Sequence, residues 1–531
     1  MKSSYWAILV YLISSTVCHG EYACVHDTLF KDVQIKSIDT AASSNISDRL
    51  RNLQSGARVW RNIRIKINYD DANAFINRDE SIKSKYEIAI RQVDSVKRYF
   101  ERYLMVNSLE IVSFNGGTCY KTTVPKFNDA LDLYVTLYPE NDSTTDYFAA
   151  ATTCYTSIFD NRPTIGAYIL NFASLKNNQL NDFIYFSTFA HEFTHILGFS
   201  DDLFSFFVDP VTKRQLSINE VVAVYSIGSE TFKTIILPQV RDYARSYFNC
   251  PTLAGLPLEN GGGSGSSGSH WEKLFLPLEY MNPTVENPGI LSTFTFKLLE
   301  GTGWYQVSYE GAQYYDWAKN VGCGQFSICP TSAGYCNSQL AGETVCSNGY
   351  TSKGTCTTES TFSSGCSIQR SLQHTCLIKG VFVEGGKEAY GPGSRCLNYR
   401  SGSGSTSQCQ MATCTANGIE IKVGANTVTC LSSESLQRKN VGLTYDLECP
   451  NYTDFCDEFS QKCPQDCNAN GLCLNSKSCF CYTGWNSVDC SSAAQIDYNK
   501  ITSGFSGNKF SIIIVVTLGS FASTLLAISL L

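Results

Sequence analysis

The sequence predicts an α+β lobe followed by a lobe held together by disulfide bonds. Apolar and polar residues alternate over residues 63–67, which indicates a half-buried strand. Apolar residues recur at helical spacing over residues 81–104, which indicates a helix long enough to lie across a sheet. Two more strands are expected at residues 131–137 and 164–171, and cysteines recur at short intervals from residue 323 to 456. Strands and helices in this order favour an α+β lobe, and the closely spaced cysteines favour a second lobe held together by disulfide bonds.

The size and charge of the chain limit the possible classes of protein. A chain of 531 residues is too long for one hydrophobic core, so we expect three or more units. Hydrophobic residues make up 43% and charged residues 17%, which is typical of a folded protein. A net charge of −7 argues against nucleic acid as a partner.

Both ends of the chain resemble targeting segments. Residues 1–20 have a basic start at Lys2 and then an apolar run, which predicts a secretory signal peptide. Residues 510–531 carry no charge, are preceded by small residues and are followed by no basic residue. These features favour a signal for a GPI lipid anchor, with a single transmembrane span as the alternative.

The cysteine count and the glycosylation sites fit an exported, surface-exposed protein. Removal of the signal peptide takes Cys18 away and leaves 23 of the 24 cysteines, an odd number. Cys24 stands apart near the new N-terminus, and the other 22 can pair completely. Its thiol is therefore a candidate metal ligand in a latent precursor. Acceptor sequences for N-linked sugar occur at Asn45, Asn141 and Asn451.

A His-Glu-x-x-His pattern marks the centre of the first lobe. His191 and His195 lie four residues apart on a predicted helix, about 40° apart around its axis, so both imidazoles leave one face and can bind one zinc ion. Glu192 lies one residue along and is aimed at the open side of the metal, where a general base is needed. Gly198 ends the helix.

A catalytic zinc needs a third protein ligand, and two residues are candidates. Asp201 lies three residues after Gly198, where a compact motif would place a ligand. His270 follows much later, at the end of the Gly/Ser-rich tract 261–269, which also suits a flexible linker. Spacing alone favours Asp201.

The chain also resembles the leishmanolysin family of surface zinc proteases. The matching segments cover residues 24–456 and are Cys24-Val-His-Asp27, Ala150-Ala-Thr-Thr-Cys154, residues 191–200 and 248–253, residues 263–270, Glu279-Tyr-Met-Asn-Pro283 and Val321-Gly-Cys323. The resemblance implies a metzincin-type zincin lobe with a twisted mixed sheet and one Zn²⁺ per chain. It also implies that His270 is the third ligand, that Met281 forms a Met-turn beneath the metal, and that Cys24 acts as a cysteine switch.

Beyond this core, residues 463–490 contain six cysteines. Their closing spacing, Cys-x-Cys-x2-Gly-aromatic-x4-Cys, resembles that of an EGF-like module.

These observations predict the following order of units. They are a signal peptide (1–20), a propeptide (21–58), an N-terminal catalytic subdomain (59–260), a subdomain with the third ligand and the Met-turn (261–322), a cysteine-rich domain (323–456), an EGF-like module (457–491), a polar spacer (492–509) and a hydrophobic tail (510–531).

Taken together, the predicted function is that of a secreted zinc metalloendopeptidase tethered to the cell surface. Zinc would activate a water molecule, and Glu192 would accept its proton and pass it to the leaving amine. Protein and peptide substrates would pair in extended form with the exposed edge of the sheet. The alternative is an inactive adhesion protein on the same scaffold. Such a protein has no need of Glu192, and a role in adhesion can also accompany catalysis.

Overall fold

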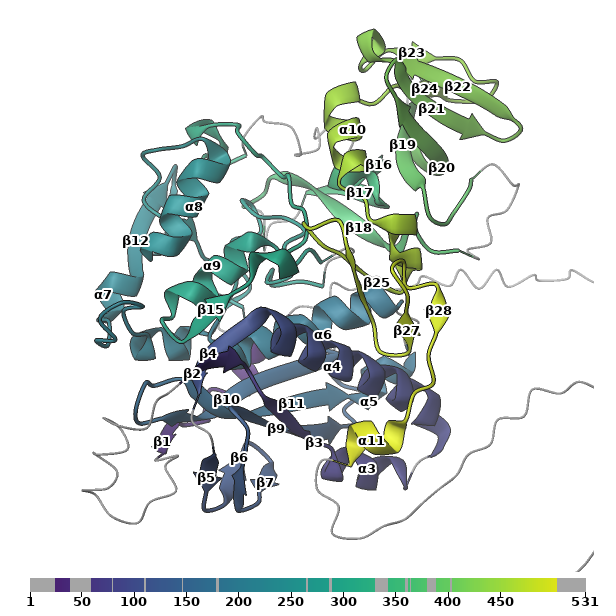
Figure 1. The fold of residues 1–531 in the computed structure, drawn as a ribbon. Coiled ribbons are helices and arrows are strands. Elements are labelled where there is room, and N and C mark those ends of the chain that lie inside the picture. The colour runs from purple at the N-terminus through teal and green to yellow at the C-terminus, as the bar shows by residue number, and fades with distance from the viewer. Residues whose placement is uncertain are drawn as a thin grey trace, which may run out of the picture.

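The fold is taken from a computed structural model of the chain (Figure 1). The described residues are 24–38, 59–78, 80–108, 111–145, 147–177, 181–263, 266–285, 289–329, 342–358, 362, 364–379, 388–401 and 404–503. The predicted signal peptide, the tail 510–531 and Asn45 lie outside these residues.

A five-stranded mixed sheet forms the floor of the first lobe. Its strands lie in the order β1 (Lys36–Ile38), β10 (Ala149–Ser157), β11 (Pro163–Asn171), β9 (Leu133–Glu140) and β3 (Ile65–Asn68). β10 runs antiparallel to β11, whereas β11, β9 and β3 are parallel. β1 comes from the predicted propeptide and pairs in parallel with β10, the strand at the edge of the remaining sheet.

Two long helices cover one face of this sheet (Figure 1). α4 (Lys83–Tyr103) is the helix predicted over residues 81–104, and the apolar positions that predicted it are buried. α6 (Asp182–Leu197) carries the His-Glu-x-x-His pattern and packs between α4 and strands β10 and β11. The strands predicted at 131–137 and 164–171 are confirmed as β9 and β11. The strand predicted at 63–67 is confirmed from Ile65 onward as β3, and β2 (Val59–Asn62) precedes it as a separate strand.

Strand β10 is the main element that the sequence pattern missed. All nine of its residues are buried, because α6 covers one face and a second apolar cluster covers the other. Without a solvent-facing side, the strand shows no alternation of polar and apolar residues. The second cluster lies under two hairpins, which are β5 (Val112–Phe114) with β8 (Phe127–Asp129) and β6 (Gly117–Cys119) with β7 (Thr122–Val124).

Further elements complete the first lobe. The helices are α1 (His26–Leu29), α3 (Asp70–Ile76), α5 (Phe172–Asn177), α7 (Ile218–Val221), α8 (Pro238–Phe248) and α9 (Thr293–Gly301). One small sheet joins β12 (Val222–Ile227), β13 (Glu230–Ile235) and β14 (Leu256–Pro257), and another joins β15 (Tyr305–Val307), β4 (Leu104–Ser108) and β2.

The cysteine-rich region forms a second lobe, which projects from the first (Figure 1). One sheet holds β16 (Thr344–Cys346), β17 (Ser352–Thr358) and β18 (Ser367–Thr375); the other holds β22 (Asn426–Leu431), β21 (Gly418–Val423), β20 (Ser405–Thr415), β19 (Ser394–Arg400), β24 (Asp446–Glu448) and β23 (Arg438–Lys439), followed by helix α10 (Tyr452–Ser460). Its disulfides include Cys329–Cys366, Cys346–Cys396, Cys376–Cys409, Cys414–Cys456 and Cys430–Cys449. The predicted disulfide-stapled lobe is therefore confirmed.

Residues 463–490 form a separate small unit, called here the three-disulfide unit. Its six cysteines pair first with third, second with fourth and fifth with sixth. Its short strands are β25 (Gly471–Cys473), β26 (Cys479–Cys481) and β27 (Trp485–Asn486); β28 (Ser492–Ala493) and α11 (Tyr498–Thr502) follow.

The three-disulfide unit packs against the back of α4 and α6. The Tyr482 ring stacks on Phe186 of α6 with the ring centroids 5.1 Å apart, and Phe480 meets Tyr99 of α4 edge-on. The Arg98 guanidinium donates a hydrogen bond to the Cys481 carbonyl. The unit therefore supports the helix that carries the histidines.

We expect Tyr482→Ala to lower the free energy of unfolding by about 3–5 kcal/mol, because it removes a large buried ring. Tyr482→Phe is the matched control. Within the described part of the chain the buried Tyr482 hydroxyl has no hydrogen-bond partner, so its loss costs little. Calorimetric melting of the two variants checks this. Equal melting temperatures of the Tyr482→Ala and Tyr482→Phe variants would contradict a stabilising role for the packing of this ring.

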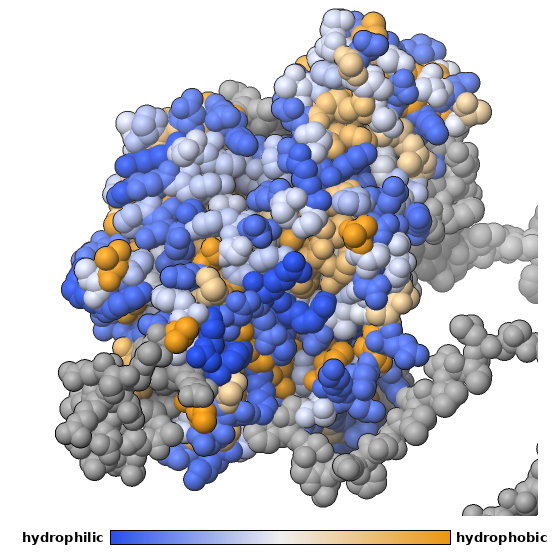
Figure 2. All heavy atoms as spheres, viewed as in Figure 1, coloured by the Kyte–Doolittle hydropathy of each residue, from blue (hydrophilic) through white to orange (hydrophobic). Residues whose placement is uncertain are grey.

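The surface that carries α4 and the three-disulfide unit is largely hydrophilic, with hydrophobic residues scattered between the polar ones (Figure 2). Among the described residues, no helix is long and apolar enough to cross a membrane.

Candidate metal centre

Helix α6 is built to hold polar side chains inside an apolar lobe. Asn181 caps its start by accepting a hydrogen bond from the Ile184 amide, and every residue from Ile184 to Leu197 is buried. Gly198 ends the helix with φ +145°, in the region that favours glycine. This turn brings the Phe199 carbonyl back to 2.6 Å from His195 Nδ1.

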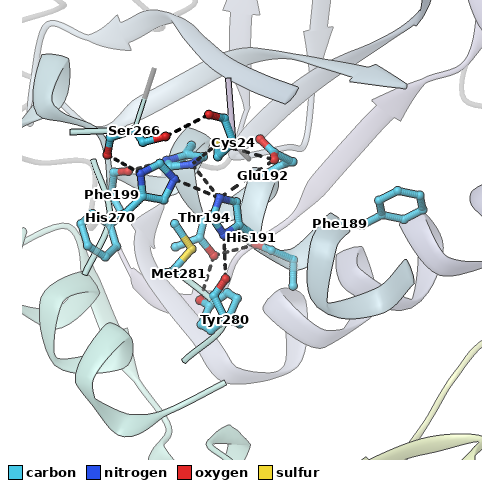
Figure 3. Close-up of polar contacts among 12 residues, drawn as sticks. Cys24, Phe189, His191, Glu192, Thr194, Phe199, Ser266, His270, Tyr280 and Met281 are labelled. Carbon is cyan, nitrogen blue, oxygen red and sulfur yellow. Dashed lines mark hydrogen bonds and ion pairs between the residues drawn. The ribbon is translucent and has the colours of Figure 1, made fainter. Parts of the chain in front are cut away.

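Three histidines converge in this part of the lobe (Figure 3). Nε2 of His191 lies 3.1 Å from Nε2 of His195 and 3.2 Å from Nε2 of His270. The Cys24 sulfur lies 3.6 Å from His195 Nε2. These four ligand atoms all lie within 4.8 Å of one another.

Each imidazole is oriented by a backbone carbonyl. Nδ1 of His191 lies 2.6 Å from the Tyr280 carbonyl, and Nδ1 of His270 lies 2.7 Å from the Ser266 carbonyl. The contact of His195 Nδ1 with the Phe199 carbonyl is of the same kind. Since a carbonyl only accepts, Nδ1 carries the proton and the Nε2 lone pair faces the centre. Burial lowers the pKa of His191 to about 4 and keeps the pKa values of the other two well below the usual one, which favours neutral, metal-binding imidazoles.

The arrangement fits a zinc ion. Tetrahedral zinc, with bonds of about 2.0–2.1 Å to nitrogen and about 2.3 Å to sulfur, holds two nitrogens about 3.3 Å apart and a nitrogen and a sulfur about 3.6 Å apart. The observed separations match these values closely. Three imidazoles and a thiolate are also a donor set that zinc prefers. Cys24 is thus the possible fourth ligand of this cluster.

The structure brings His270 to the centre and leaves Asp201 outside it. The Asp201 carboxylate lies 2.7 Å from Lys233 Nζ, on the partly exposed side of the loop. The loop before His270 is closed by Glu259, whose amide donates to the His270 carbonyl and whose carbonyl accepts from Gly268. Ser266, Gly268 and Ser269 are buried, so the part of this tract next to His270 is packed into the lobe, whereas Gly262 and Gly263 are exposed.

Glu192 and Met281 lie on opposite sides of the histidines. Glu192 Oε1 is 4.0 Å from both His191 Nε2 and the Cys24 sulfur, and burial raises the pKa of the carboxyl well above its usual value. The Met281 side chain lies beneath the imidazoles, fully buried (Figure 3). Its turn is tied by Glu279, whose carboxylate accepts hydrogen bonds from the Met281 amide and from Thr295.

His26 is a residue of this centre that sequence reasoning missed. Its ring stacks on His195, with the centroids 4.0 Å apart, and its Nε2 lies 3.1 Å from the Ser200 hydroxyl. The sequence placed it only in the propeptide, two residues after Cys24. Spacing along the sequence cannot show a stacking contact between residues that are far apart in the chain.

Most cysteines behave as predicted. All described cysteines other than Cys24 are disulfide-bonded, whereas Cys24 remains a thiol. Cys119–Cys154 and Cys250–Cys323 pair within the first lobe and at its junction with the second.

An α+β lobe with three converging neutral imidazoles and a buried glutamate beside them defines a metallopeptidase-type centre. The family model described as leishmanolysin matches residues 104–463. The chain therefore belongs to the leishmanolysin family, a family of zinc metalloendopeptidases, and the resemblance found in the sequence is confirmed.

Individual relatives agree with this assignment. A leishmanolysin-like peptidase of Caenorhabditis elegans is 34% identical over 223 residues, which cover 36% of this chain and 33% of the relative. The Drosophila melanogaster leishmanolysin-like peptidase is 33% identical, covering 28% of this chain and 26% of its own. Leishmanolysin of Leishmania tropica is 28% identical over 37% of this chain and 27% of its own. The chain thus spans about a third or less of the length of these relatives.

Proposed function

We propose that this chain is a zinc endopeptidase of the cell surface, held latent by its propeptide. The observation that carries the proposal is the convergence of His191, His195 and His270 beside the Glu192 carboxylate. A metal-binding adhesion protein would use the same three imidazoles but would have no use for a buried carboxylate oxygen that lacks a protein partner. Glu192 Oε2 is such an atom among the described residues.

The residues have separable tasks in peptide hydrolysis. His191, His195 and His270 would hold zinc, which when bound supplies a Lewis acid for the scissile carbonyl and an acidified water. Glu192 accepts the proton of that water and delivers it to the leaving amine. The Tyr280 carbonyl fixes the His191 ring, so that the ligand geometry persists while the substrate changes shape.

The propeptide supports a latent form. Cys24 lies close enough to the three imidazoles to be a fourth ligand, and its amide donates a 2.8 Å hydrogen bond to the Pro283 carbonyl. Strand β1 covers part of the β10 edge, where an extended substrate would otherwise pair. The propeptide would therefore block both the metal and the sheet edge.

We expect Cys24→Ser to raise the protease activity of the unprocessed chain by about tenfold or more, because a hydroxyl replaces the thiolate at the metal, and about 1.4 kcal/mol of lost ligation suffices for tenfold. Hydrolysis of a fluorescent protein substrate checks this. As the control, parent and variant should be equally active once residues 1–58 are removed. Equal activity before removal would contradict the switch.

Several features support export to the surface. Disulfides of this number are typical of proteins from oxidising compartments. Asn141 is exposed and Asn451 is half-buried at the surface, so both are accessible to sugar. We infer a secreted protein whose hydrophobic tail is a signal that is removed when a GPI anchor is attached, with the three-disulfide unit as an EGF-like module.

The test is metal content together with cleavage of casein by the full chain purified from secreting cells, with and without residues 1–58. We expect one zinc per chain, cleavage by the processed form, loss of cleavage with a chelator and recovery with zinc. A folded, zinc-loaded, processed chain that cuts no protein would overturn the proposal and favour the adhesion alternative.

A further inference from the structure

A pocket next to the metal centre is lined in part by polar groups that lack a hydrogen-bond partner among the described residues. It spans about 430 Å³, its open mouth included, and lies beside His191 and Glu192. One wall comes from Ser187 and Thr188 of α6, and the other from residues 282–285, which follow the Met-turn. Cys24 also lines this pocket, so the latent form covers it.

Asn282 is the most unusual residue of this pocket. Its side chain is fully buried, and within the described part of the chain neither its amide oxygen nor its amide nitrogen has a hydrogen-bond partner. Thr188, 9% exposed, likewise has a hydroxyl without a partner among these residues. Burying such groups unpaired costs free energy, so native proteins rarely do so without a ligand.

The position of the pocket identifies the part of a substrate that enters it. Glu192 must reach the nitrogen of the leaving amine, and Glu192 itself lines the pocket. The side chain of the residue that carries this nitrogen therefore points into the pocket. Release of Cys24 also frees the Pro283 carbonyl, which then accepts a backbone N–H of the bound peptide.

We propose that Asn282 and Thr188 determine specificity, and that the protease selects a short, uncharged, hydrogen-bonding residue directly after the scissile bond: serine, threonine or asparagine. This inference rests on the proposed endopeptidase function. The amide of Asn282 supplies one donor and one acceptor, which match a hydroxyl or a second amide. Glu192 disfavours an acidic residue there, since the described lining residues include neither lysine nor arginine.

The test compares two peptides that differ only after the scissile bond, where one has threonine and the other has isosteric valine. The enzyme is the processed chain, purified from secreting cells and freed of residues 1–58, so that residue 24 does not cover the pocket and β1 does not cover the β10 edge. We expect kcat/KM to favour threonine by about tenfold or more, because valine leaves the buried polar groups unpaired. Asn282→Leu should bring this ratio to about one or below, with zinc content unchanged. Thr188→Val, which keeps the shape of the side chain, should lower it in the same direction.

A ratio near one in the parent, or a ratio unchanged by both substitutions, would overturn the inference. If Asn282→Leu fails to fold, the parent ratio and Thr188→Val decide. A binding measurement separates this inference from the proposed function. Calorimetry on the processed chain with Glu192→Gln should show tighter binding of the threonine peptide even without turnover. Tighter binding of the threonine peptide without any cleavage would contradict only the endopeptidase proposal. Equal binding of the two peptides would contradict the proposed specificity of the pocket.

Discussion

Glu192→Gln is expected to retain one zinc per chain and to lose about 10²–10⁴-fold in kcat/KM on a protein substrate. The amide has nearly the shape of the carboxylate but cannot accept the proton of the attacking water. Zinc should stay because His191, His195 and His270 would hold it, and Glu192 does not belong to the cluster that these imidazoles form with Cys24. Metal analysis together with hydrolysis rates of the processed chain checks both halves of this expectation.

The control for this prediction is Glu192→Asp, which keeps a proton acceptor but retracts it by one methylene. It should recover part of the rate, since efficiency depends on reach as well as on basicity. If the Gln variant cut protein at the parent rate, Glu192 would not be the general base.

His270→Ala should abolish both zinc binding and cleavage. The ring supplies one of three nitrogens, and losing a direct ligand should weaken zinc by more than the roughly 10–100-fold that changes to the residues supporting a ligand typically cause. Loss of the zinc would also leave the buried imidazoles of His191 and His195 without the ion that they share. Competition with a chelator of known affinity measures the loss, and circular dichroism reports whether the chain remains folded.

Asp201→Asn is the matched comparison, because spacing alone made Asp201 the rival ligand. Its carboxylate pairs with Lys233 at the surface, so zinc affinity and kcat/KM should stay within about twofold of the parent, as expected for a change at an exposed ion pair. Loss of zinc in Asp201→Asn with retention in His270→Ala would reverse the ligand assignment.

Local patterns predicted the elements whose burial is one-sided. The helix over residues 81–104 and the strands near 131–137 and 164–171 were found because packing and solvent impose a period on the sequence. Strand β10 was missed, since both of its faces are covered. The docking of Tyr482 behind α6 was also missed, because nothing in the cysteine spacing of a small module shows which surface it meets.

For the metal centre, too, the sequence determined some features and the tertiary structure decided the others. By itself, the sequence determined that His191 and His195 share one helix face with Glu192 one residue along, since four residues make about one turn. It also indicated Cys24 as the candidate for the cysteine left over when the others pair. On spacing alone it favoured Asp201 as the third ligand, and only the family resemblance favoured His270. Only the tertiary structure decided that His270 meets the helix, that His26 stacks on His195, and that Asn282 lies unpaired beside Glu192. These contacts join segments far apart in the chain. Their cost in chain entropy is offset by packing across the whole lobe, which no local pattern records.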